Sequence, residues 1–198
     1  HGPAAARLGQ EAHGRPGRYS GKQLPAVLPM RDLFDDAVLA SQPLDVALTL
    51  PARFYTDPRM PMLDARAIFA RSWQLVGHQS QVADVGDHMV TEIAGLPLIV
   101  VRGEDAVIRA FHNVCRHRAG PIASCDGRGA KALRCRYHGW TYGLDGVLRG
   151  APEMGRTKDF NPSDIRLPEV RVQLWQGLVF VAIGDAPPFA EVVAGIDE

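Results

Sequence analysis

Two short segments of metal-ligand type constrain the fold of this chain more than any other feature. The first reads Cys115-Arg116-His117, and the second, which follows residues 118–134, reads Cys135-Arg136-Tyr137-His138. Each offers one thiolate and one imidazole, the side chains that suit transition metals best. Each also follows an apolar run and precedes Gly or Pro, as expected for the tip of a hairpin loop. The fold must therefore hold two ligand-bearing loops.

A single zinc ion is the first alternative for such ligands. Zinc motifs usually place two cysteines only a few residues apart, so that both reach one ion. Here each short pair is mixed, and only Arg116 separates Cys115 from His117. That spacing favours two metals: if the loops face each other, both cysteines bind an inner iron and both histidines bind an outer one. A structural zinc module stays an alternative.

The residues around both segments favour the two-metal interpretation. The stretches 113–118 (Asn-Val-Cys-Arg-His-Arg) and 135–140 (Cys-Arg-Tyr-His-Gly-Trp) resemble the motif of Rieske [2Fe-2S] proteins. This resemblance implies one [2Fe-2S] cluster per chain, which relays single electrons. Its ligands would be Cys115, His117, Cys135 and His138. Neutral histidines leave the cluster less negative than four thiolates would, so an added electron is easier to accept. The imidazoles should face solvent or a partner.

The loops also indicate which branch of the Rieske proteins the chain resembles. Respiratory Rieske proteins add a cysteine to each loop and join the two by a disulfide, whereas this chain has Gly120 and Tyr137 at those places. The remaining cysteine, Cys125, has no partner of this kind and is expected to be a plain thiol. The resemblance therefore points to the lower-potential branch, which contains oxygenase components and small Rieske ferredoxins.

The flanking sequence is similar to the large subunit of Rieske non-haem iron oxygenases. The similarity lies in residues 68–73, 76–78 and 86–87 before the loops and in residues 139–146 after them. Residues 117–121 are similar to the choline monooxygenase and glycine-betaine demethylase-like subgroup, which suggests a quaternary-ammonium or small-amine substrate. This resemblance implies an oxidoreductase, a monooxygenase or dioxygenase component. It would pass electrons from a reductase or ferredoxin to a mononuclear iron within a homotrimer.

The mononuclear iron site is expected outside this sequence. In the family, two histidines and a carboxylate hold that iron, and His138 is the last histidine here. We therefore expect the chain to be the N-terminal part of a longer polypeptide, in which residues 186–198 begin a linker to a catalytic domain. We assign no catalytic residue to the chain itself. A stand-alone Rieske ferredoxin, an electron carrier, is the alternative.

Apolar runs and turn residues predict a mainly β protein. Residues 1–40 are interpreted as a flexible arm with a short helix over 31–40. Residues 41–185 form the Rieske domain, with a helical lead-in over 57–71 that Asp57-Pro58 begins. Antiparallel strands are predicted at residues 73–77, 88–94, 97–102, 107–112, 132–134, 141–148 and 170–183, with turns at 145–146 and 176–177. We expect a sandwich or small barrel with two cluster-binding hairpin loops, a covering loop over 149–169, and no internal repeat.

Composition excludes several classes of function. The chain has 22 Lys plus Arg against 22 Asp plus Glu, so it lacks the positive excess of a nucleic-acid or membrane-surface binder. No unbroken apolar run is long enough for a spanning helix, and three cysteines favour the cytoplasm. Between the ligands, however, six basic residues accompany one acid, Asp126. This local excess predicts a docking face for an acidic electron donor.

Overall fold

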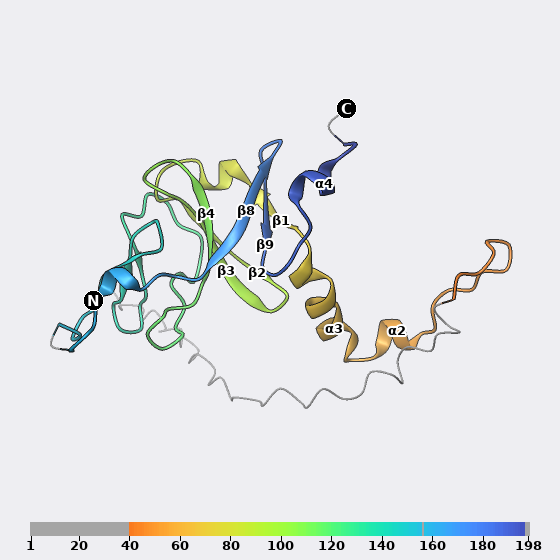
Figure 1. Cartoon of the computed structure of the whole chain (residues 1–198), viewed down its shortest axis with the longest axis horizontal. Helices are drawn as coiled ribbons and strands as arrows, with labels where there is room; N and C mark the ends of the chain where they lie inside the picture. The colour runs from red at the N-terminus through yellow and green to blue at the C-terminus, as the bar shows by residue number, and fades with distance from the viewer. Residues whose placement is uncertain (1–39, 156, 197–198) are drawn as a thin grey trace, which may run out of the picture. The chain divides into compact units, whose positions relative to one another are not determined.

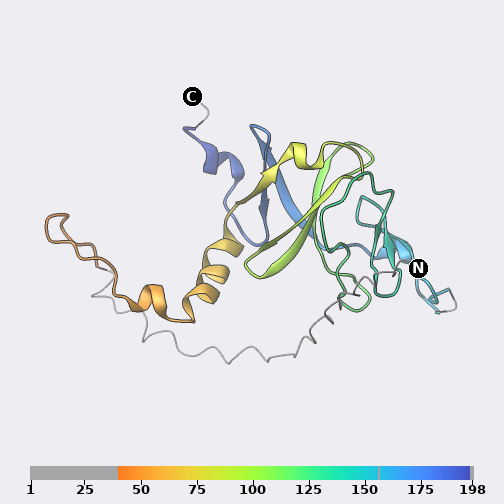
Figure 2. The ribbon, with the colours of Figure 1, turned by 180° about the vertical axis from the view of Figure 1, so that it is seen from behind.

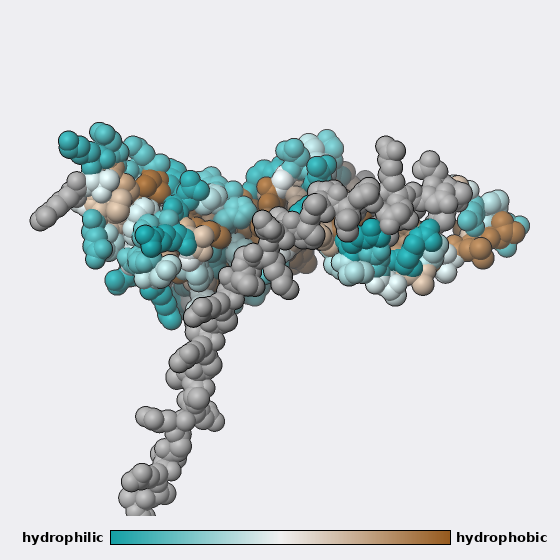
Figure 3. All heavy atoms as spheres, turned by 90° about the horizontal axis from the view of Figure 1, so that it is seen from below, coloured by the Kyte–Doolittle hydropathy of each residue, from teal (hydrophilic) through white to brown (hydrophobic). Residues whose placement is uncertain are grey.

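The computed structural model describes residues 40–155 and 157–196 (Figure 1). The chain divides into two compact units, residues 1–54 and 55–198, and the strands found among the described residues all belong to the second. The predicted arm over 1–40 and its helix lie outside the described residues, except for residue 40. In the first unit, large apolar side chains alternate along residues 44–50 and stand exposed, visible as brown spheres in Figure 3.

The helical lead-in is shorter than predicted. Helix α3 (Met60–Ala67) and the 3-10 turn η2 (Phe69–Arg71) occupy the predicted span, but the helix begins three residues after Asp57. Asp57 does not cap the helix, because its carboxylate accepts hydrogen bonds from the backbone and guanidinium of Arg59 at 2.9 and 2.7 Å. These bonds lower the pKa of Asp57 to about 2. Short helix α2 (Arg53–Thr56) was not predicted.

A six-stranded antiparallel sheet forms the body of the second unit. Its strands are β1 (Gln74–His78), β2 (His88–Ile93), β3 (Leu96–Arg102), β4 (Ile108–His112), β8 (Glu169–Trp175) and β9 (Leu178–Ala182), in the order β1-β9-β8-β4-β3-β2. These positions confirm the predicted strands. Strands β2, β3 and β4 pair in chain order, but β1 pairs with β9, and the hairpin β8–β9 lies between β1 and β4.

A small three-stranded sheet carries the second ligand segment. It consists of β5 (Leu133–Arg134), β6 (Thr141–Tyr142) and β7 (Leu148–Gly150). Figure 1 and Figure 2 both show the loops around this sheet gathered at one end of the six-stranded sheet, away from α3. In residues 151–155 and 157–168 the regular structure is the 3-10 turn η4 (Pro162–Asp164) and an isolated antiparallel bridge between Arg166 and Val147. The fold is therefore mainly β with few short helices, as predicted.

Two hydrophobic cores support these layers. One lies against the six-stranded sheet and includes Val82, Leu98, Val179 and Val181. The other surrounds the small sheet and contains both cysteines of the ligand segments together with Trp140 and Tyr142. Met154 and Phe160 of the irregular segment pack against this second core. The ligand loops are thus fixed by burial, not only by their own turns.

Two turns of the chain are built alike. Residues 103–109 and 143–149 share the pattern Gly-x-Asp-x-Val-x-Arg. In both, the glycine N–H donates to the valine carbonyl, at 2.9 and 2.8 Å, and the aspartate and arginine form an ion pair, at 2.6 and 2.7 Å. The first turn joins β3 to β4 in the six-stranded sheet, and the second joins β6 to β7 in the three-stranded sheet. The shared pattern covers a single turn, so it is not a repeated structural unit of the fold.

The end of the described chain is a short helix. Helix α4 (Phe189–Val193) packs through Phe189 on Trp73 and Phe180, with ring centroids 5.1 Å apart in both pairs. The indole N–H of Trp73 also donates to the Pro187 carbonyl at 2.8 Å. Across the described residues, no helix has the length and apolar character needed to cross a membrane.

Candidate metal centre

The first ligand loop follows β4 and closes on itself. The Cys115 N–H donates to the Gly120 carbonyl at 2.8 Å, and the Ala119 N–H donates to the Cys115 carbonyl at 3.0 Å. Ala119 adopts a φ of 55°, in the left-handed region that a closing turn needs. These contacts turn the chain so that Cys115 is buried while the loop residues on either side of His117 stay exposed.

The second loop, between β5 and β6, has the same closure. The Cys135 N–H donates to the Trp140 carbonyl at 2.9 Å, and the Gly139 N–H donates to the Cys135 carbonyl at 3.0 Å. Gly139 takes the left-handed position, with a φ of 75°. The two loops therefore present their cysteines in matching turns, although one histidine follows its cysteine by two residues and the other by three.

The two cysteines lie side by side at the buried end of the centre. Both are free thiols, 3% and 2% exposed. Burial raises the pKa of the Cys135 thiol; backbone N–H groups of Tyr137 and His138 oppose that shift, while the adjacent Cys115 sulfur adds to it. Metal binding at this pair would therefore release protons.

Gly120 permits the close approach of the loops. A Cβ atom at this position would lie 3.3 Å from Cys135 Sγ and 3.2 Å from Tyr137 Cβ, which is tighter than ordinary packing. Any side chain at position 120 would therefore push against the second loop, which glycine avoids.

The two histidines form the outer end of the centre. Their ring centroids are 4.7 Å apart at an interplanar angle of 70°. His138 is exposed and His117 is half-buried. Burial lowers the pKa of His117, and the positive charges of His138 and Arg118 lower it further. A neutral ring of this kind keeps a lone pair for a metal.

One polar atom of the site has no partner in the protein. Among the described residues, the Nδ1 atom of His117 is the buried side-chain nitrogen or oxygen that lacks a hydrogen bond. A buried polar atom without a partner is costly, so this nitrogen fits a role as metal ligand. The His117 ring stacks on Trp140, with centroids 4.8 Å apart and planes 7° apart, which fixes its orientation.

Tyr142 supports the cysteine end. It is fully buried, its hydroxyl lies 3.2 Å from Cys115 Sγ, and it accepts a hydrogen bond from the Arg116 N–H at 3.0 Å. Burial raises the pKa of Tyr142 far above its usual value, and the Cys115 contact raises it further. The phenol therefore stays protonated and can donate its hydrogen to the sulfur.

This arrangement suits a binuclear cluster better than one zinc ion. No group of three or more His, Cys, Asp or Glu side chains in the described part of the chain is placed to hold a metal ion. A structural zinc site needs four such groups around one point. A Rieske cluster instead takes two sulfurs on one iron and two imidazoles on the other, and the predicted ligands lie as one sulfur pair and one ring pair.

Two polar side chains that position the loops were not singled out from the sequence. Buried Asn113 accepts hydrogen bonds from the Ile122 and Ala123 N–H groups at 2.9 and 3.0 Å, and so holds the end of the first loop. Buried Asp87 accepts from Arg128 at 2.8 Å and from the Gly129 N–H at 3.0 Å.

Asp87 thus anchors the connection between the loops. Arg128 belongs to the basic excess between the ligand segments, and it forms an ion pair with Asp87 at 2.8 Å. The sequence offered one sign that Asp87 has a structural role: it follows Gly86 and directly precedes a predicted strand. That glycine, Gly86, has no room for a side chain, because a Cβ would lie 2.1 Å from the Ala130 carbonyl oxygen.

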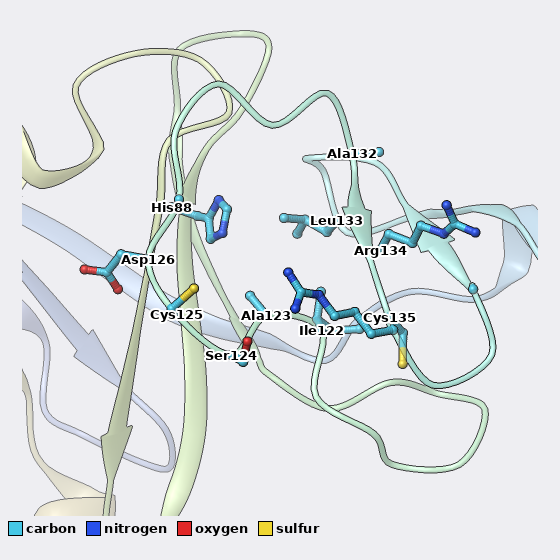
Figure 4. Close-up of a pocket in the computed structure, with 13 residues that line it drawn as sticks. His88, Ile122, Ala123, Ser124, Cys125, Asp126, Ala132, Leu133, Arg134 and Cys135 are labelled. Atoms are coloured by element: carbon cyan, nitrogen blue, oxygen red, sulfur yellow. The ribbon is translucent and has the colours of Figure 1, made fainter. Parts of the chain in front are cut away.

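A hollow of about 600 Å³ borders the second loop. Figure 4 shows His88, Cys125 and Asp126 on one wall and Arg134 and Cys135 on the other. Cys125 is an exposed free thiol whose sulfur lies well apart from that of Cys135, as expected for a plain thiol.

Comparison with known proteins identifies the family. Residues 72–161 match the family model of the Rieske [2Fe-2S] domain. The chain carries a Rieske domain. The carnitine monooxygenase oxygenase subunit of Escherichia coli (strain K12) is 38% identical over 135 residues, which cover 68% of this chain and 36% of that protein. The glycine betaine monooxygenase oxygenase subunit of Chromohalobacter salexigens is 42% identical over 142 residues, which cover 71% of this chain and 31% of that protein.

Solved structures agree with these relatives. A quaternary ammonium Rieske monooxygenase, whose structure bears on carnitine oxidation and inter-subunit electron transfer, superimposes with a TM-score of 0.70 at 34% identity, over 76% of this chain and 42% of that chain. The similarity covers the Rieske domain. The chain spans about a third of the length of the curated relatives it matches.

Proposed function

We propose that the Rieske domain binds one [2Fe-2S] cluster through Cys115 and Cys135 on the inner iron and His117 and His138 on the outer iron. The observation that carries this assignment is the pairing of two buried sulfurs with two adjacent imidazoles, one of which has a buried nitrogen without a protein partner. When bound, the cluster accepts and donates one electron at a time. The protein residues set its polarity and its exposure.

The domain would serve as the electron-transfer part of a Rieske-type oxygenase. Its relatives are oxygenase subunits, which favours this role over a stand-alone ferredoxin. A reductase or ferredoxin would supply the electrons, and a mononuclear non-haem iron in a catalytic domain would receive them. Because His138 is exposed, it would be the ligand through which electrons pass to another protein surface, and we propose that this surface belongs to a neighbouring subunit of a homotrimer.

The substrate we propose is a quaternary ammonium compound. Both curated relatives act on such compounds, carnitine and glycine betaine, by their names. This proposal rests on the sequence similarity to these relatives. The polypeptide from the complete gene, supplied with NADH and a reductase, should consume oxygen when either compound is added; no uptake with either would refute this substrate class.

Iron and acid-labile sulfide analysis tests the cluster. We expect two irons and two sulfides per chain and, after reduction by dithionite, a paramagnetic signal typical of mixed cysteine and histidine ligation. His138→Ala should abolish that signal, whereas His78→Ala should retain it, because His78 hydrogen-bonds Ser80 far from the loops in sequence. Colourless protein with stoichiometric zinc would refute the proposal.

A further inference from the structure

Five exposed apolar side chains gather where the 3-10 turn η2, strand β1 and helix α4 meet. They are 43–61% exposed: Ile68, Phe69, Leu75, Val192 and Ile196. We call this group the α4 face. Single exposed apolar residues are common on any protein, but a contiguous group of them marks an interaction surface. The α4 face is therefore expected to be buried by a partner.

Contacts of neighbouring side chains join β1 and α4 into one surface. Leu75 of β1 stands directly opposite Phe180 of β9, so both side chains point to the same face of the sheet. The Phe180 ring lies 5.1 Å from the ring of Phe189, the first residue of α4. Val193, one turn further along α4, is buried, whereas Val192 stays exposed. The exposed side of α4 therefore continues the surface that Leu75 begins.

The turn η2 borders the same surface. The Gly184 N–H, just after β9, donates to the Ala70 carbonyl of η2 at 2.9 Å. Glycine permits this contact, because a Cβ at position 184 would lie 2.7 Å from that carbonyl oxygen. Ile68 and Phe69 directly precede Ala70, and so they lie next to the segment that leads from β9 to α4.

The segment between β9 and α4 is held against the sheet. The Arg171 guanidinium donates to the Gly184 carbonyl and, at 3.4 Å, to the Ala186 carbonyl. It also lies over the Trp73 ring, 5.2 Å from the centroid. The Trp73 indole N–H in turn donates to the Pro187 carbonyl. The residues that follow α4 therefore leave the domain from a fixed point at the edge of the α4 face.

The length of the relatives and the character of the face favour the same polypeptide as the partner. The chain spans about a third of the length of the curated relatives it matches, so such proteins carry much more chain than a Rieske domain. A segment tethered next to a surface reaches it at a high effective concentration, which a separate molecule lacks. The five side chains also carry no charge, and permanent interfaces are more apolar than transient ones.

We propose that the α4 face is an internal interface, on which the part of the polypeptide after residue 198 packs. This inference rests on the proposed function, because that part would be the catalytic domain of the oxygenase. Leu75 and Val192 would be buried in the interface, and α4 would lie between the two domains. A large apolar interface of this kind limits the motion of one domain against the other. The α4 face would thus fix the orientation of the Rieske domain.

Photo-crosslinking in the polypeptide from the complete gene tests this inference. The photoreactive residue p-benzoylphenylalanine replaces Leu75 in one variant and Val107 in the matched control. The two side chains are 54% and 50% exposed, but Val107 lies between β3 and β4, which do not neighbour β1 in the sheet. After irradiation, the Leu75 variant should give at least about tenfold more product that joins it to residues beyond 198 of its own chain. Such a product keeps the mass of one chain on a denaturing gel.

Charged substitutions give an independent measurement on the complete polypeptide. Leu75→Asp with Val192→Asp should divide thermal unfolding into two transitions, because carboxylates buried in an apolar interface would separate the domains. Leu96→Asp with Val107→Asp, at side chains that are also exposed, should leave one transition. Iron and sulfide content shows whether each variant keeps a folded Rieske domain.

Several outcomes would overturn the inference. A Leu75 product with the mass of two chains would assign the α4 face to a second copy. Equal yields of single-chain product at Leu75 and Val107, or none at Leu75, would also contradict it. If the photoreactive residue at Leu75 lowers the cluster content, Val192 takes its place and the same outcomes apply. Failure of the proposed function is distinct, because the unmodified protein would then lack the two irons and two sulfides.

Discussion

Removing the Tyr142 hydroxyl should lower the midpoint potential of the cluster. In Tyr142→Phe the ring remains in its fully buried place, but the contact at 3.2 Å to Cys115 Sγ and the bond from the Arg116 N–H are lost. The hydroxyl oxygen accepts from that N–H, so its hydrogen is free to point at the sulfur. A donor beside the sulfur stabilises the reduced cluster more than the oxidised one, because reduction adds negative charge.

The size of the change follows from the strength of the bond. A hydrogen bond to a charged group contributes about 1.5–3 kcal/mol. If about 1 kcal/mol of this is gained only on reduction, the potential falls by about 40 mV, since a tenfold change in a one-electron equilibrium is about 59 mV. The raised pKa of Tyr142 means that the phenol stays a donor across the working pH range. The shift should therefore be independent of pH near neutrality.

Protein-film voltammetry measures this shift directly. The control is Tyr137→Phe, which removes a phenol oxygen from the exposed tip and should leave the potential unchanged. Iron and sulfide content and the melting temperature show whether each variant keeps its cluster and fold. An unchanged or raised potential in Tyr142→Phe, with the cluster intact, would refute the assignment of Tyr142 as a donor to the sulfur.

Three further predictions concern the supports of the centre. Trp140→Leu should broaden the paramagnetic signal of the reduced cluster and speed iron loss, whereas Trp140→Phe, which can still stack, should do so less. Asp87→Asn should lower the melting temperature at pH 7, more than Asp84→Asn does. Hydrogen bonds from Arg128 lower the pKa of Asp87 in the folded protein. The stabilisation from Asp87 is therefore fully present above the pKa of the unfolded state and is lost as pH falls through the pKa of the folded state. The difference in melting temperature between the two variants should therefore vanish in acid. Gly146→Ala should cost about 1–3 kcal/mol more than Gly95→Ala in denaturant unfolding, because both have a positive φ but only at Gly146 would the new Cβ meet a buried phenylalanine, at 2.6 Å; equal losses would contradict the packing argument.

The strand positions and the ligand set could be predicted, but the strand partners could not. Alternating apolar residues and turn signals mark where a strand lies, and β2, β3 and β4 follow them closely. The same pattern does not reveal pairing across long separations, and so it does not predict that β1 pairs with β9. Helix α3 began late because Asp57 bonds locally to Arg59, a competition that the capping pattern does not reveal.

Asn113 and Asp87, which position the ligand loops, could not be predicted for a related reason. A single Asn or Asp in a sequence is most often exposed, and nothing in the pattern marks Asn113 or Asp87 as buried. Their partners, Ile122 and Arg128, lie 9 and 41 residues away. Cys115 and Cys135 could be predicted as ligands because metal ligation requires particular side chains at particular spacings. A side chain that anchors the backbone can be of several types and can lie at many spacings.

The centre is asymmetric, and the asymmetry separates two kinds of control. Its sulfur end is buried and hydrogen-bonded through Tyr142, while its imidazole end is exposed among arginines. Contacts at the first end should set the potential, and charges at the second should set the rate of encounter. Tyr142→Phe should therefore leave the salt dependence of cluster reduction by a ferredoxin unchanged, and Arg136→Glu should change it with little shift in potential. In the double variant both effects should add, because the two groups act on different steps; a coupled response in either measurement would mean that the two ends are not independent.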